Sequence, residues 1–120
     1  MAQLDVFNPV AEIRGDLKPQ GVSPRVASLE GRTLGLLWSG TTNGDVALRR
    51  VERHMRERFP KVQTKFFQGD HPFAERLLRE VAESCDGVVI ATADLGACSS
   101  WSIHGAVQLE KLGRPAVTGR

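Results

Sequence analysis

The sequence has little cysteine and no long apolar run, and each shortage excludes a class of protein. No stretch approaches the ~20 apolar residues of a membrane span, so we expect no membrane association. The two cysteines, Cys85 and Cys98, have no close Cys-x-x-Cys partner, which argues against a structural disulfide or a zinc site. The three histidines do not repeat at ligand spacing, and we expect neither a metal nor a cofactor.

Neither targeting signals nor charge of one sign stand out. The first five residues lack the basic and then apolar regions of a signal peptide, which predicts a cytoplasmic protein. The net charge of +2 comes from 16 basic and 14 acidic side chains. The one dense arginine cluster, at residues 49–58, alternates with apolar residues and has no interleaved aromatics. It is typical of the solvated face of a helix, so we expect no nucleic-acid partner.

What is present indicates one soluble α/β domain with an arm before it. A chain of 120 residues, 41% hydrophobic and 25% charged, suits a single core. Residues 1–30, interrupted by proline and glycine, predict an extended N-terminal arm whose apolar residues dock rather than stay in water. Residues 31–120 form the predicted domain. Its periodicity predicts strands over 33–38, 62–67, 87–93 and 116–118, and helices over 46–59, from near 72, and from 99 or 100 to 112.

This alternation predicts a small doubly wound, flavodoxin-like parallel sheet of about four strands flanked by helices. Ligands of such sheets bind beyond the carboxyl ends of the strands. The loops at residues 39–45 and 94–102 both follow strands and therefore lie at that edge. If the first and third strands are neighbours, Thr41, Thr42 and Asn43 face Cys98 across a crevice.

Cys98 lies between an apolar strand and an amphipathic helix, with Ser99 or Ser100 available as the helix cap. The unpaired N–H groups and the positive end of the helix dipole favour a thiolate over a thiol there. The sequence therefore predicts an accessible, nucleophilic cysteine. A packing role, common for free cysteines, is the alternative.

Other side chains near these loops have two interpretations each. The loop at residues 41–43 either holds an anionic group through its N–H groups or is only a turn, with Asp45 capping a helix that starts at Val46. Ser99, Ser100 and Trp101 are further candidates for ligand contact, although Trp101 equally suits a helix anchor. Two side chains are candidates for proton transfer, His104 and Asp94. The alternative for His104 is a surface residue, and the alternative for Asp94 is the cap of a turn.

The residues around Cys98 resemble a known family. Leu-Gly-Ala-Cys at positions 95–98, with residues 99–104 after it, is similar to the selenocysteine- or cysteine-Gly-Ser-Cys hallmark of UGSC-like proteins. The likeness covers most of the chain. Residues 29–37 resemble the family's first strand, 43–45 its polar turn, and 109–117 its closing helix and next strand.

The resemblance implies thiol or selenol redox chemistry without fixing a substrate. Leu95 stands where the family carries its selenocysteine or first cysteine, and Ala97 replaces the serine. Only Cys98 carries over, so a dithiol cycle within one chain is not expected. A related likeness, to the aspartate/glutamate racemase superfamily, implies two sequence halves that each give an acid–base residue, which one short domain supplies only by pairing.

Two classes of function follow. In the first, the chain is a thiol enzyme or enzyme subunit that acts on a small anionic molecule, with Cys98 as nucleophile or redox centre. In the second, it is a non-catalytic binding or scaffold subunit that has lost the family's first cysteine. In either class the small sheet and the apolar arm predict a homo-oligomer, in particular a homodimer, or a partner subunit.

Overall fold

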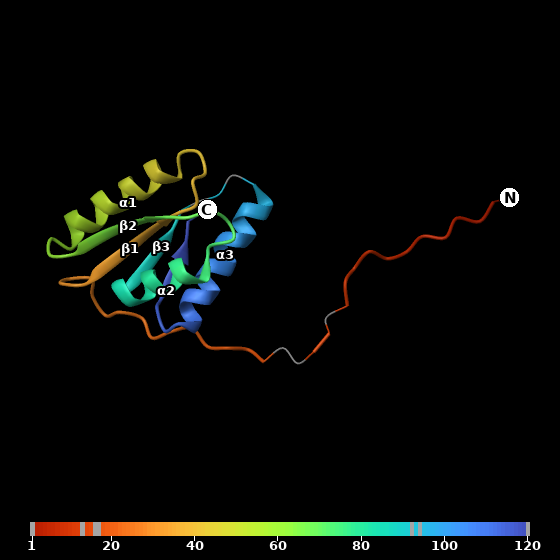
Figure 1. Cartoon of the computed structure of the whole chain (residues 1–120), viewed down its shortest axis with the longest axis horizontal. Helices are drawn as coiled ribbons and strands as arrows, with labels where there is room; N and C mark the ends of the chain where they lie inside the picture. The colour runs from red at the N-terminus through yellow and green to blue at the C-terminus, as the bar shows by residue number, and fades with distance from the viewer. Residues whose placement is uncertain (1, 13, 16–17, 92, 94, 120) are drawn as a thin grey trace.

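The computed structural model describes residues 2–12, 14–15, 18–91, 93 and 95–119 (Figure 1). The chain alternates strands and helices as the sequence predicts. The elements are β1 (Thr33–Trp38), α1 (Gly44–Arg58), β2 (Gln63–Gln68), α2 (Glu75–Ser84), β3 (Gly87–Ile90), α3 (Gly96–Lys111) and β4 (Ala116–Thr118). Within this described part, no helix has both the length and the apolar character that a bilayer crossing requires.

The four strands form one parallel sheet in the order β2-β1-β3-β4. The predicted flavodoxin-like architecture is confirmed, including the pairing of the first strand with the third. Leu36 in β1 lies opposite Phe66 in β2 and Val89 in β3. The chain reverses its direction of winding between β1 and β3, which is the point where such sheets bind ligands.

Alternation along β1 divides the core into two layers. Leu34 and Leu36 face α1, where they pack with the buried Leu48. Leu37 faces the other side, where α2 and α3 cover the sheet with Leu78 and other apolar residues. Strand β1 is apolar on both faces because helices cover both of them.

Two glycines allow neighbouring side chains to lie close to the backbone on the side of the sheet that α2 and α3 cover. A Cβ added at Gly35 in β1 would lie 2.9 Å from the Cys85 sulfur, so that cysteine fills the space above the strand. A Cβ added at Gly105 in α3 would lie 2.8 Å from the Phe73 ring. Cys85 is therefore a packing residue, and Phe73 seats α3 on the loop between β2 and α2.

Two helices begin at positions that differ from the predicted ones. Helix α1 starts at Gly44, and the residue before it, Asn43, adopts a left-handed conformation with φ 62° and forms no side-chain cap. Asp45 lies inside the first turn, so the expectation that it caps a helix from Val46 is wrong. Helix α2 starts at Glu75, a turn later than expected.

The described residues of the arm contain no helix or strand. Residues 2–12 are exposed and extend away from the domain (Figure 1). The radius of gyration is 18.0 Å, against about 14 Å for a compact chain of this length. Among the described residues of the arm, Ser23 is the first that is buried, and docking begins there.

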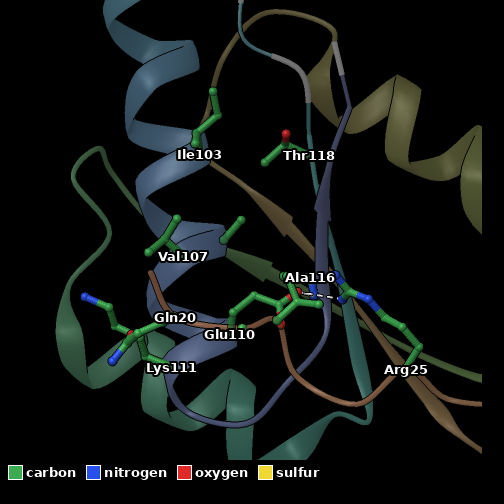
Figure 2. A pocket seen from close by; sticks show the side chains of 11 residues that line it. Gln20, Arg25, Ile103, Val107, Glu110, Lys111, Ala116 and Thr118 are labelled. Carbon is green, nitrogen blue, oxygen red and sulfur yellow. Dashed lines mark hydrogen bonds and ion pairs between the residues drawn. The ribbon is translucent and has the colours of Figure 1, made fainter. Parts of the chain in front are cut away.

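Glu110, near the end of α3, holds the base of the arm to the sheet (Figure 2). Its carboxylate accepts hydrogen bonds from the Ser23 N–H at 2.6 Å and the Ala116 N–H at 3.0 Å. It also forms an ion pair with Arg25 at 2.6 Å. Burial opposes ionisation of Glu110, but the hydrogen bonds from Ala116, Ser23 and Arg25 outweigh it and lower the pKa of Glu110 to about 2.

We predict that Glu110→Gln lowers the free energy of unfolding at pH 7 by roughly 2 kcal/mol, since it removes charge-assisted bonds to a shielded carboxylate. The native pKa lies below the ordinary value of 4.5. The stabilisation is therefore complete above about pH 4.5 and is lost as the pH falls toward 2. Urea unfolding across this range should show a shallower acid dependence in the variant. Glu83→Gln, at an exposed position of α2, is the control, and equal losses in both variants would contradict the assignment.

Candidate functional site

The carboxyl ends of the strands gather several loops at one edge of the sheet. The loop after β1 leads into α1, the loop after β2 leads into α2, and residues 91–95 lead from β3 into α3. Since β1 and β3 are neighbours, the first and third of these loops leave the sheet side by side. The predicted site falls at this edge.

Helix α3 begins earlier than the sequence indicated. Leu95, in extended conformation, precedes its first residue, Gly96, and the Ser99 N–H donates to the Leu95 carbonyl oxygen at 2.9 Å. The Ser100 hydroxyl donates to the Gly96 carbonyl oxygen at 3.0 Å. The expectation that Ser99 or Ser100 caps the helix is therefore wrong, because both lie inside it. Cys98 is half-buried in the first turn, where helix N–H groups still lack intrahelical partners.

A polar contact joins α3 to the loop after β2. The Ser102 hydroxyl, 3% exposed, lies 3.3 Å from Nε2 of His71. The His71 ring also meets the Phe73 ring edge-on, with centroids 4.7 Å apart. Burial lowers the pKa of His71 below its ordinary value of 6.5, so the imidazole is mainly neutral at pH 7.

Cys98 and Ser102 are four residues apart in α3 and lie one above the other on the same helix face. Cys98 is thus one turn from the hydroxyl that contacts His71. The structure places a thiol, a buried hydroxyl and a neutral imidazole on one side of the helix start. The Ser102 hydroxyl and the His71 imidazole can share a proton with each other, and Cys98 lies one helical turn from that contact.

A cavity of about 520 Å³ opens beside this helix start. Ser99 and Ser102 contribute hydroxyls to its wall, and Leu95 and Ile103 contribute apolar groups. The remaining lining residues lie after β3 and at the start of α3 (Ala93 and Gly96) or at and after the end of β4 (Thr118 and Gly119). The size suits a small molecule. Of the predicted site residues, Ser99 lines this cavity, whereas Cys98 is not among its lining residues.

The loop at residues 41–43 is organised around Trp38. The Trp38 indole N–H donates to the Thr41 carbonyl oxygen at 2.8 Å, and the Gly44 N–H donates to the same oxygen at 3.1 Å. A Cβ at Gly44 would lie 2.7 Å from the Trp38 ring. Thr42 and Asn43 are exposed. These contacts make the loop a well-held turn, and neither Thr42 nor Asn43 lines the cavity beside α3.

His104 and Trp101 pack on each other rather than on Cys98. Their rings meet edge-on with centroids 5.5 Å apart, and the His104 ring also lies 3.5 Å from the Gln108 amide. Cys98 and His104, six residues apart, are on different faces of α3. Asp94 lies outside the described residues.

His71 is the site residue that sequence reasoning missed. Its loop follows β2, so it lies at the same sheet edge as the predicted site. This position after a strand is the sequence feature that could have identified His71. The contact with Ser102 depends on how α2 and α3 pack side by side, which periodicity does not show. In the described ranges, no group of three or more His, Cys, Asp and Glu side chains is placed to hold a metal ion.

Comparison with known families gives a match that extends over nearly the whole chain. The model of the UGSC family matches residues 5–118, which includes most of the arm as well as the domain. No curated protein and no solved structure matches the chain.

We predict that iodoacetamide modifies Cys98 in the folded protein at pH 7.5 while Cys85 stays unmodified. Cys85 is 3% exposed, and burial raises the pKa of its thiol to about 11, whereas Cys98 is partly accessible. Peptide mass spectrometry locates the label, and denaturation in urea should make both thiols reactive. Cys98→Ser should abolish native labelling. Equal native labelling of the two cysteines would contradict the predicted difference.

Proposed function

Because the chain belongs to the UGSC family, we propose that it is a thiol-dependent enzyme, or a subunit of one, that acts on a small anionic molecule through Cys98. The observation that carries the proposal is the position of Cys98. It lies in the first turn of α3, at the carboxyl edge of the sheet, one turn from the buried Ser102–His71 contact.

Each neighbouring group has a role in this proposal. The N–H groups of the first turn of α3 and the hydroxyl of Ser99 attract an anionic group, because the positive end of the helix dipole lies there. The neutral imidazole of His71 accepts the thiol proton, with Ser102 holding the ring in place. His71 takes this role in preference to His104, whose ring packs against Trp101 on another face of the helix.

One sulfur sets the reactions that are available. The Cys98 thiolate can attack an electrophilic carbon and release a leaving group with its electron pair. It can equally attack a disulfide, so that the sulfur–sulfur bond breaks, a mixed disulfide forms and one thiolate leaves. Resolution of that mixed disulfide requires a second thiol from another molecule, since Leu95 provides none.

Leu95 also supports a second candidate function. Leu95 is 64% exposed and lines the cavity, and the resemblance implies that it stands where the family carries its first cysteine. An apolar group there suits a binding or scaffold subunit that keeps the pocket without the chemistry. The reactivity of Cys98 separates the two candidates.

The test is the rate of Cys98 alkylation by iodoacetamide from pH 5 to 9, with glutathione as the reference thiol. A thiol enzyme should react faster than glutathione at pH 7. His71→Asn should slow the reaction about fivefold, the equivalent of one hydrogen bond of ~1 kcal/mol. His54→Asn, on the exposed face of α1, is the matched control and should leave the rate unchanged. A rate below that of glutathione, unaffected by His71→Asn, favours the binding subunit.

A second prediction concerns the missing sulfur. Leu95→Cys should create a pair of thiols at the start of α3 that closes to a disulfide with Cys98 under mild oxidation. Thiol titration should then find two fewer free thiols in the oxidised variant, whereas Leu95→Ser should lose none. If the unmodified protein already reduces disulfides as fast as Leu95→Cys, the alignment of Leu95 with the first position of the motif is wrong.

A further inference from the structure

The outer face of α3 and the N-terminal arm are two apolar surfaces that one chain leaves uncovered. A groove of about 590 Å³ runs between α3, β4 and the base of the arm (Figure 2). Ile103 and Val107, 57% and 45% exposed, lie one helical turn apart in its wall. In the arm, the most exposed apolar side chains are Leu4, Val6, Phe7 and Val10.

We propose that residues 2–12 of one chain lie along this groove on a second copy, and that the second copy returns the same contact. Each chain offers one arm and one groove, so a two-fold pairing buries both surfaces at once. The apolar side chains exposed on the arm and in the groove would cover one another in this contact.

The dimensions fit the proposed contact. Eleven extended residues reach about 36 Å, whereas α3 from Gly96 to Lys111 is about 24 Å long. The arm segment can therefore follow the helix from the groove to the cavity beside Cys98. Ile103 and Thr118 line both hollows, so a partner's arm in the groove reaches the wall of the site.

Charge suits the arm to the groove, and chain direction favours the arm of a second copy over the chain's own arm. Residues 2–12 contain Asp5 and Glu12 and no basic residue. The groove is lined by Lys111 and by Arg25, which forms an ion pair with Glu110, so its charge is positive by one. Residues 18–26 contain no turn, so the arm leaves its own α3 in extended form. The family match also begins within this segment, at residue 5.

The test is the mass of the full chain by light scattering after size-exclusion chromatography. We expect a dimer that becomes a monomer when residues 2–12 are deleted, and likewise in Phe7→Gln or Val107→Gln. Val46→Gln is the matched control, because Val46 is 61% exposed on α1, away from the groove. That variant should remain a dimer, and circular dichroism should show that every variant is folded.

Mixing two of these variants tests whether one arm and one groove are sufficient for pairing. The deletion variant keeps its groove and Val107→Gln keeps its arm, so together they should form a heterodimer through one arm, although each alone is a monomer. A full chain that is monomeric, with its arm free or folded onto its own groove, would overturn the proposal. So would a dimer that survives deletion of the arm. The measurement is independent of thiol chemistry, and Cys98→Ser can serve as its background.

Discussion

The contact between Phe73 and Gly105 is the constraint on which both functional surfaces depend. The ring passes so close to α3 that a Cβ at residue 105 would lie 2.8 Å from it. A helix seated this closely has little freedom to rotate about its axis. In this fixed orientation of the helix, Ser102 points inward to the loop after β2, and the next residue, Ile103, is exposed to solvent. One packing contact thus fixes the side of α3 on which Ser102 lies, while Ile103 lines both the cavity at the helix start and the groove.

The site combines a family position with local electrostatics. Membership of the UGSC family covers nearly the whole chain, and the chemistry proposed for Cys98 depends on the residues around it. A thiol at the start of a helix, next to a buried hydroxyl and a neutral imidazole, can react without a second sulfur.

The alternation of apolar strands and amphipathic helices was sufficient to predict the architecture. Strand β1 is apolar on both faces, which requires helices on both sides, and the chain reversal then places loops 39–43 and 91–95 together. Helix starts were less predictable. Polar residues suggested caps at Ser99 and Asp45, but backbone conformation determined the starts, through the extended Leu95 and the left-handed Asn43.

The part of the site that escaped prediction depends on lateral packing. His71 reaches α3 because Phe73, two residues later, enters the core under that helix. Sequence spacing reports which face of one element is apolar, but it does not report which neighbouring element that face meets. The exposed arm shows the same limit. Its apolar residues indicate that the arm contacts another surface, but they do not indicate which surface.

Glu110 has a consequence for the edge of the sheet. Strand β4 is terminal and spans only Ala116–Thr118. The Pro115 carbonyl oxygen accepts a bond from Val88 in β3, so the next N–H along the strand, that of Ala116, points away from the sheet. The Glu110 carboxylate accepts from that N–H. An incoming strand would find its first donor occupied and a short, charged edge, which protects the sheet against edge-to-edge growth into aggregates.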